Sequence, residues 1–97
     1  MAAKQLIKFE AAWCGPCRMW EPIVKKLADM YGLELVHVDV DEQPDVAEKA
    51  DVRGLPTLVL MDEDGTETAR TTGARIFAAA ERDLGLKPLD RVHPAPQ

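Results

Sequence analysis

The sequence lacks the features of membrane, secreted and nucleic-acid-binding proteins. No apolar run approaches the roughly 18 residues that suggest a membrane-spanning helix. Residues 1–5 lead into a predicted strand without the hydrophobic core of a signal peptide. Basic residues are not in excess, because 12 Lys and Arg against 17 Asp and Glu give a net charge of −5, with both signs interspersed. A nucleic-acid surface would need a basic patch. We therefore expect neither a membrane nor a nucleic-acid partner, and a cytoplasmic location.

Cysteine is also scarce, since Cys14 and Cys17 are the only two in 97 residues. In a reducing cytoplasm a lone pair is more often catalytic or metal-binding than a structural disulfide. Zinc normally takes four ligands, and the other candidate ligands, His37 and His93, lie in a predicted strand and in the C-terminal tail. A pair of inert core thiols would not need this spacing. We interpret the pair as a redox site without a metal, with metal binding and inert thiols as the alternatives.

The spacing of the two cysteines suits reversible disulfide chemistry. Thiols at i and i+3 on the first turn of a helix close a small ring with little backbone movement. Unpaired N–H groups and the helix dipole at that end favour the thiolate, which is the attacking species. We expect Cys14 to be the exposed nucleophile and Cys17 the sheltered resolving thiol. Pro16 suits the first helical turn, and Gly15 lets a partner's backbone approach closely.

Hydrophobic periodicity around the cysteines predicts a strand, a helix and a second, parallel strand. Apolar and polar residues alternate over Leu6–Ala11 and again over Leu35–Val40, which is typical of strands. The segment Pro16–Met30 has helical periodicity and contains Pro22, which should kink the helix. The residues of this helix that should face the sheet are Cys17, Trp20, Val24, Leu27 and Tyr31.

The second half of the sequence predicts a helix, two strands and a final helix. A short helix is expected over Pro44–Ala50, because proline is common at helix starts. The strand Thr57–Met61 is almost wholly apolar and should be central, whereas the threonine-rich strand Thr66–Thr72 should lie at an edge. The last helix is expected over Ala74–Leu84. Its inward residues should be Ile76, Phe77, Ala80 and Leu84.

The chain is predicted to form one domain over residues 1–86, followed by a tail over 87–97. The tail has three prolines and no periodicity, so we expect it to be mobile or draped over the surface. No internal repeat is visible. A monomer is expected, because no apolar stripe is left over once the core is assigned.

Two motifs together resemble the thioredoxin family. They are the sequence Trp13-Cys14-Gly15-Pro16-Cys17 at the start of the first helix, and Arg53-Gly54-Leu55-Pro56-Thr57 before the third strand. The resemblance extends from about Leu6 to Leu86. It implies an α/β thioredoxin fold with the element order βαβαββα. The four-stranded mixed sheet would have the strand order 2-1-3-4, with helices on both faces.

The resemblance also implies an activity, that of a protein-disulfide reductase in cellular electron transport. Cys14 and Cys17 would pass electrons to protein substrates and end as a redox-active disulfide. No bound cofactor is implied. Electrons would come from NADPH through a separate thioredoxin-reductase-like flavoprotein. The Gly15-Pro16 dipeptide resembles the reducing members of the family rather than the oxidants.

Several residues acquire roles through the resemblance. Trp13 flanks the reactive cysteine, and the peptide bond before Pro56 is expected to be cis, which is uncommon outside tight turns. The turn would present the backbone of Leu55, where an extended substrate pairs as an added strand. The implied substrate-binding residues are Trp13, Gly54, Leu55, Pro56, Gly73 and Ala74.

The chain begins at what resembles the second strand of a thioredoxin. Three positions also depart from the family pattern. The family's buried carboxylate, six residues before the first cysteine, is replaced by Lys8. The lysine that usually pairs with that acid corresponds to His37, and a family tryptophan is replaced by Glu10. Lys8 and Glu10 share a strand face and would form an ion pair. Our hypothesis is that Glu10, His37 or water moves the proton of Cys17. The alternative is that Lys8 extends to solvent, because burying an unpaired charge is costly.

Two other functions remain open on the sequence. One is a glutaredoxin-like hydrogen donor to ribonucleotide reductase, which the short N-terminus favours and the Trp-Cys-Gly-Pro-Cys motif disfavours in a glutathione-dependent form. The other is a binding or accessory subunit with dispensable thiols.

Overall fold

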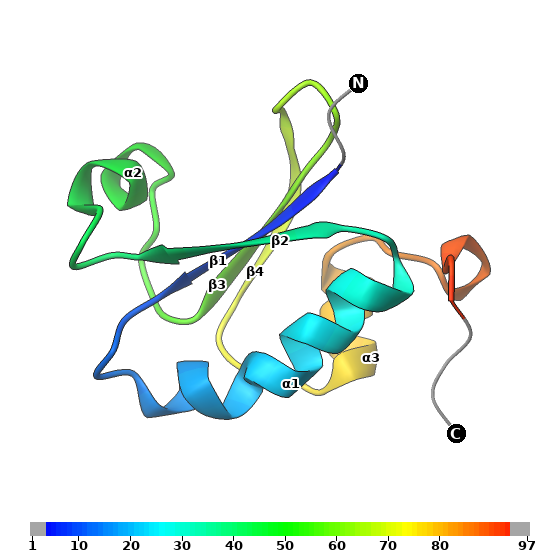
Figure 1. The fold of residues 1–97 in the computed structure, drawn as a ribbon, viewed down its shortest axis with the longest axis horizontal. Coiled ribbons are helices and arrows are strands. Elements are labelled where there is room, and N and C mark those ends of the chain that lie inside the picture. Colours follow the sequence, from blue (N-terminus) through cyan, green and yellow to red (C-terminus); the bar gives the residue numbers. More distant parts are fainter. Residues whose placement is uncertain (1–3, 94–97) are drawn as a thin grey trace.

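A four-stranded sheet forms the middle layer of the structure, a computed structural model that describes residues 4–93 (Figure 1). Its strands are β1 (Gln5–Glu10), β2 (Glu34–Asp39), β3 (Thr57–Met61) and β4 (Glu67–Thr72). The spatial order is β2-β1-β3-β4, with β1 parallel to β2 and the other two pairs antiparallel. The predicted strand order is confirmed. Strands β1 and β3 are therefore central, with a neighbour on each side.

Helices cover both faces of the sheet, also as predicted (Figure 1). The elements are α1 (Gly15–Met30), α2 (Pro44–Lys49), α3 (Phe77–Asp83) and a short 3₁₀ helix, η1 (Pro88–Asp90). Helices α1 and α3 pack on one face, and α2 packs on the other. Among the described residues, no helix combines the length and the apolar character needed to cross a membrane.

The larger core lies between the sheet and helices α1 and α3. Leu6 and Leu58 from the central strands pack there with Val24 and Leu27 of α1. All four side chains are fully buried, and each contributes roughly 1.5–3 kcal/mol by leaving water. The predicted inward stripe of α1 is confirmed. This packing holds the first turn of α1 against the end of β1, where the two cysteines lie.

The final helix starts later than the sequence predicts. It begins at Phe77 rather than Ala74, and Ile76 has extended backbone, with φ −62° and ψ 156°. The Ile76 side chain is 73% exposed, so the prediction that it faces inward was wrong. The segment before α3 is instead held by the indole of Trp20, whose Nε1 donates to the Arg75 carbonyl at 2.7 Å. A buried indole N–H usually finds such a partner, and it fixes residues 74–76 as a loop.

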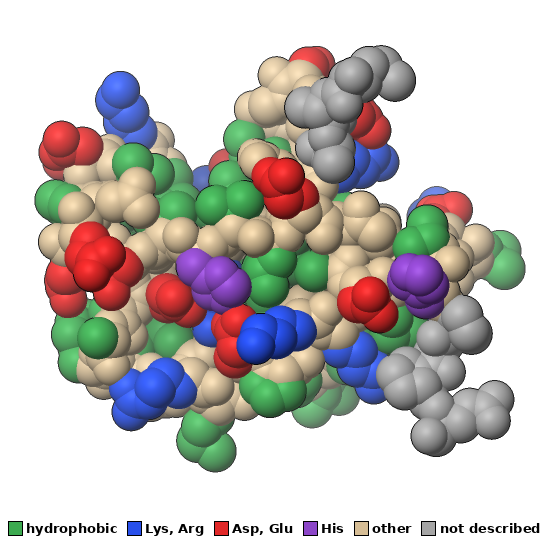
Figure 2. Space-filling model, in the orientation of Figure 1, with side chains coloured by type: hydrophobic (Ala, Val, Ile, Leu, Met, Phe, Trp, Pro, Cys, Tyr) green, Lys and Arg blue, Asp and Glu red, His purple; other side chains and the backbone are tan. Residues whose placement is uncertain are grey.

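The start of the predicted tail lies on the surface formed by α1 and α3. The Val92 N–H donates to the carbonyl of Met30 at 2.7 Å, and the Arg91 guanidinium pairs with Glu81 at 2.6 Å. Residues 94–97, the end of the predicted tail, lie outside the described part of the chain. On the face in Figure 2, acidic and basic side chains are interspersed among hydrophobic ones.

Candidate active site

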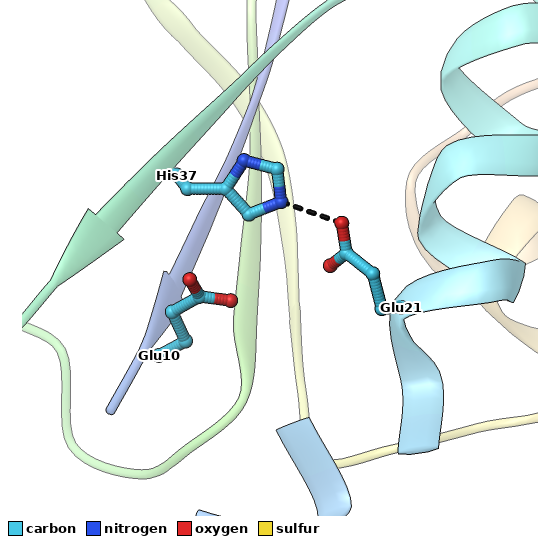
Figure 3. Close-up of side chains that lie close together, drawn as sticks. All are labelled: Glu10, Glu21 and His37. Atoms are coloured by element: carbon cyan, nitrogen blue, oxygen red, sulfur yellow. Dashed lines mark hydrogen bonds and ion pairs between the residues drawn. The ribbon is translucent and has the colours of Figure 1, made fainter. Parts of the chain in front are cut away.

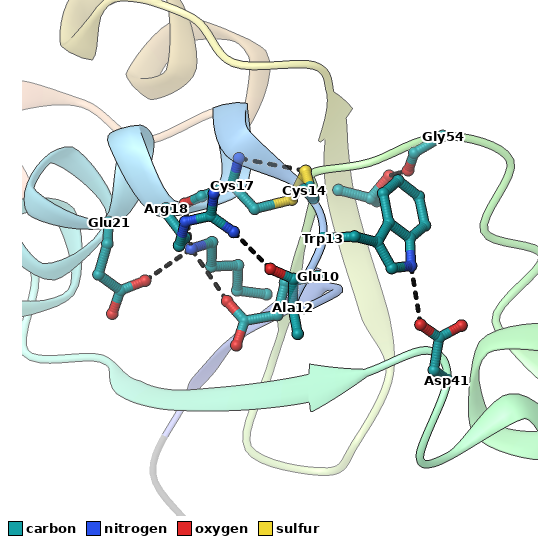
Figure 4. The surroundings of a disulfide bond; sticks show 11 residues. Glu10, Ala12, Trp13, Cys14, Cys17, Arg18, Glu21, Asp41 and Gly54 are labelled. Atoms are coloured by element: carbon teal, nitrogen blue, oxygen red, sulfur yellow. Dashed lines mark hydrogen bonds and ion pairs between the residues drawn. A yellow bond between two sulfur atoms is a disulfide. The ribbon is translucent and has the colours of Figure 1, made fainter.

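The two cysteines occupy the first turn of α1 and are joined by a disulfide bond (Figure 4). Cys14 is the N-cap residue of the helix, with extended backbone, and its Sγ accepts the N–H of Cys17 at 3.2 Å. Pro16 stands in the first turn, where a missing N–H removes no helical bond. The local sequence thus places one sulfur against the main-chain donors that open the helix.

A groove of about 490 Å³ opens beside Cys14. Cys14 is only 5% exposed, so the expectation of an exposed Cys14 was wrong. Cys17 is 1% exposed. Only Cys14 of the pair lines the groove. The other lining residues are Trp13, Gly15, Pro16, Val40, Ala47, Val52, Arg53, Gly54 and Leu55.

Trp13 lines the groove and is held by the loop that follows β2, the strand next to β1. Its Nε1 donates to Asp41 Oδ2 at 2.8 Å (Figure 4). The main-chain N–H of Asp41 in turn donates to Asp39 Oδ1 at 2.8 Å. Although 69% of Trp13 is exposed, the hydrogen bond fixes one edge of its ring. The loop after β2 therefore orients an apolar surface next to Cys14.

Another part of the groove lining comes from the loop before β3. The Leu55–Pro56 peptide bond is cis. The Thr57 hydroxyl donates to the Gly54 carbonyl at 2.6 Å, and the Gly73 N–H donates to the Pro56 carbonyl at 2.8 Å. These bonds hold Gly54 and Leu55 at the groove. Pro56 is buried behind them and does not line it.

A second apolar hollow also has Pro16 in its lining. It brings Ala74 and exposed Ile76, from the loop before α3, next to Met19 of α1. Ala74, a predicted substrate-binding residue, thus lies in a different hollow from Trp13 and Leu55. Pro16 lines both hollows, so the two form adjoining surfaces around the cysteine turn.

Lys8 lies between β1 and α1 with only 1% of its side chain exposed. Its Nζ donates to the carbonyl of Cys17 at 2.6 Å and lies 2.7 Å from Glu21 Oε1 and 3.0 Å from Glu10 Oε1. The predicted ion pair with Glu10 is confirmed, and the alternative that Lys8 extends to solvent was wrong. Lys8 shares a strand face with Leu6, and α1 covers that face. A charged side chain under a helix needs partners, and Lys8 has three.

Glu21 connects this buried charge to the surface. Its Oε2 lies 2.7 Å from Nε2 of His37, on β2 (Figure 3). Partial burial acts to raise the pKa of Glu21, but the hydrogen bonds with Lys8 and His37 outweigh it, so the pKa lies below its ordinary value. His37 is 38% exposed. The network of Lys8, Glu10, Glu21 and His37 therefore extends from the backbone of Cys17 to solvent.

The same side chains raise the question of a metal centre. Glu10, Glu21 and His37 offer ligand atoms that lie within 4.8 Å of one another (Figure 3). The ammonium group of Lys8 already pairs with both carboxylates. A divalent cation would have to bind beside this positive charge. The arrangement favours a charge network over a metal site.

Comparison with known proteins decides the family. The sequence profile of the family described as thioredoxin matches residues 1–82. The chain belongs to the thioredoxin family. Thioredoxin H2 of Arabidopsis thaliana is 45% identical over 71 residues, which cover 72% of this chain and 53% of that protein. The mitochondrial thioredoxin-3 of Saccharomyces cerevisiae is 43% identical over 87 residues, which cover 89% of this chain and 65% of that protein.

Solved thioredoxin structures agree with the fold. The oxidised form of mitochondrial thioredoxin 3 from S. cerevisiae superposes with a TM-score of 0.75 at 38% identity, covering 89% of this chain and 81% of that one. The thioredoxin of Fasciola hepatica gives a TM-score of 0.75 at 36% identity, with coverage of 89% and 83%. The predicted thioredoxin fold is thus confirmed. The chain spans between about half and two thirds of its first curated relatives, 53% of thioredoxin H2 and 66% of thioredoxin-2 of S. cerevisiae.

Glu21 is the residue of the charge network that the thioredoxin resemblance did not identify. The motifs draw attention to the cysteine turn and to the strand position of Lys8, whereas Glu21 lies one turn further along α1. The signal that was available is its spacing. Residues i and i+4 share a helix face, so Glu21 lies on the same side of α1 as Cys17, toward β1.

Proposed function

We propose that the protein reduces disulfide bonds of other proteins by dithiol–disulfide exchange. The observation that carries the proposal is the cysteine pair in the first turn of α1, with the Cys17 N–H directed at Cys14 Sγ. A main-chain donor and the positive end of the helix dipole both stabilise a sulfur anion. The first turn of α1 contains no acidic residue to oppose it. Cys14 is therefore assigned as nucleophile and Cys17 as resolving thiol.

The reaction has two exchange steps. The Cys14 thiolate attacks one sulfur of the substrate disulfide, and the other substrate sulfur leaves as a thiolate that takes up a proton. The Cys17 thiolate then attacks Cys14 Sγ, which forms the Cys14–Cys17 bond and releases the remaining substrate sulfur as a thiolate that takes up a proton. Two electrons have passed to the substrate. A thioredoxin-reductase-like flavoprotein would then reduce the Cys14–Cys17 disulfide with two electrons from NADPH, so this chain needs no bound cofactor.

The groove beside Cys14 would receive the substrate. Its apolar lining, which includes Trp13 and Leu55, accommodates side chains that flank a disulfide without selecting one sequence. An extended substrate segment would pair with the main chain at Leu55, as added strands do at other sheet edges. Gly73 and Pro56 support this loop from behind. A disulfide-containing protein is therefore the proposed substrate class, and the cytoplasm, where disulfides are kept reduced, is the proposed location.

The proton of Cys17 must leave before the second step. Glu10 and His37 belong to the network that reaches Cys17, and either of these groups or water would accept the proton. The pH dependence of the second step separates these routes. If the pH profile of this step is unchanged in both Glu10→Gln and His37→Ala, water accepts the proton.

Capture of substrates tests the proposal. Cys17→Ser leaves Cys14 able to attack but removes the thiol that resolves the mixed disulfide. We expect this variant to retain disulfide-bonded proteins that reductant releases, whereas Cys14→Ser, Cys17→Ser retains none. The wild-type protein, once reduced, should also reduce the disulfides of insulin. Absence of both results would exclude the reductase function. Biological activity retained by the double variant would favour a binding subunit.

A further inference from the structure

We propose that the buried ammonium group of Lys8 stabilises the thiolate of Cys17, and that Glu21 is a positioning residue that holds and partly neutralises this ammonium group. The inference rests on the proposed exchange reaction and concerns its second step, in which Cys17 must lose its proton.

The contacts of Lys8 connect it directly to the resolving cysteine. Its Nζ lies 2.6 Å from the carbonyl oxygen of Cys17, so the charge adjoins the residue whose sulfur must ionise. The side chains of Lys8 and Cys17 are each 1% exposed. Both side chains are shielded from solvent, and a charge in such surroundings acts more strongly than at the surface. A nearby positive charge favours the ionised form of a thiol.

Negative groups around Lys8 limit this effect. Two carboxylates lie within 3.0 Å of its Nζ, those of Glu21 and Glu10. On the β3 side its register partner is the apolar Leu58. Asp39 opposes Glu10 in the strand register, and its Oδ1 is engaged by the N–H groups of the following loop. The titratable groups near the pair are thus Glu10 on β1, Arg18, Glu21 and Lys25 on α1, and His37 and Asp39 on β2.

The signs of these charges separate an electrostatic role from a structural one. Replacing Lys8 by an apolar side chain removes the positive charge and leaves the carboxylates, so the Cys17 thiolate becomes less favourable. Replacing Glu21 by glutamine keeps a hydrogen-bond acceptor for Lys8 but removes a negative charge, so the thiolate becomes more favourable. If Lys8 only supported packing, the two substitutions would not act in opposite directions.

A single-thiol protein measures this effect without turnover. In reduced Cys14→Ser, Cys17 is the only thiol, and the ultraviolet absorbance of its thiolate can be followed against pH. We expect Lys8→Met in this background to lower the thiolate fraction about tenfold at a pH below the midpoint of the titration. Glu21→Gln should raise that fraction. Lys26→Met, which removes the same charge from an exposed position of α1, is the matched control and should titrate as its parent.

Folding of each variant is checked by circular dichroism before titration. If Lys8→Met does not fold, the thiolate fraction of Glu21→Gln alone tests the inference. This variant is expected to fold, because Glu21 is only partly buried. A fall or no change in the thiolate fraction of Glu21→Gln would overturn the inference, as would a shift in Lys26→Met equal to that of Lys8→Met. Insulin reduction by the wild-type protein is measured separately. Failure of the proposed function and failure of the Lys8 role are thereby distinguishable.

Discussion

Because of Glu21, the contribution of the charge network to the free energy of unfolding should depend on pH. The pKa of Glu21 is lowered in the folded protein, because its bonds with Lys8 and His37 outweigh its partial burial. A carboxyl with a lowered folded pKa contributes stability above its unfolded value, and this contribution is lost as the pH falls through the folded value. We expect the wild-type protein to exceed Glu21→Gln in free energy of unfolding by about 1 kcal/mol at neutral pH. The difference should vanish in acid.

Urea denaturation at a series of pH values measures this difference. The exposed Glu48 on α2 offers a matched control, because Glu48→Gln makes the same chemical change outside the network. A wild-type curve parallel to that of Glu21→Gln down to acidic pH would contradict the expected contribution of Glu21.

Some contacts of single residues could not be predicted from sequence patterns. The alternation over β1 correctly placed Lys8 and Glu10 on one face, yet it could not show that this face is covered. A strand in isolation reads as half-exposed, and only the strand order places β1 in the centre under α1. Glu21 was missed for the same reason, since its contact with Lys8 joins residues 13 apart in sequence. Cys14, Cys17 and Trp13 were identifiable because their chemistry is local to one turn.

At the scale of elements, α1 and the six-residue α2 were predicted closely, whereas the start of α3 was placed too early. Helix α1 has 16 residues, and its buried stripe was predicted despite Pro22 inside it. Helix α3 has only seven, and its predicted start was three residues early. The first residues of that prediction, 74–76, were assigned from periodicity. In the structure the indole of Trp20 donates a hydrogen bond to the Arg75 carbonyl, and the two residues are 55 positions apart in the sequence.

The C-terminal segment provides a prediction about one element. We propose that the domain ends at Leu86, as the sequence predicts, and that residues 87–93 stabilise it without being required for folding. Arg91 binds Glu81, which is 6% exposed and also accepts a hydrogen bond from the Tyr31 hydroxyl. Removal of residues 87–97 leaves this carboxylate without its guanidinium partner, and an unpaired buried charge is costly. A chain of residues 1–86 should therefore fold with a lower melting temperature.

Calorimetry of the chains 1–86, 1–93 and 1–97 tests this prediction. The 1–93 chain retains the contacts of Arg91 and Val92 and should melt close to the full chain. An equal loss in 1–93 and 1–86 would place the stabilising contacts beyond residue 93. An unfolded 1–86 chain would contradict the proposed domain boundary.

At the scale of the whole molecule, the fold brings four segments together around the cysteine turn. The loop after β1 supplies Trp13, the loop before β3 supplies Leu55, and the loop before α3 supplies Ile76, which lies beside Met19 of α1. The two apolar hollows share Pro16 in their linings. A protein substrate is large enough to contact both hollows at once, whereas a small disulfide reaches only the sulfur.

This geometry predicts that Ile76 contributes to the recognition of protein substrates. Ile76→Ser removes an exposed apolar side chain that would lose contact with water on binding, worth about 1.5 kcal/mol or roughly a tenfold rise in KM for a protein disulfide. Its effect on reduction of a small disulfide should be much smaller. Leu89→Ser makes a comparable change at a side chain that is 98% exposed on η1, outside the hollows, and should leave KM unchanged. Steady-state assays with insulin and with a small aromatic disulfide measure KM for the two kinds of substrate. Equal effects of Ile76→Ser on the two substrates would indicate that Ile76 supports the cysteine turn and does not bind the substrate.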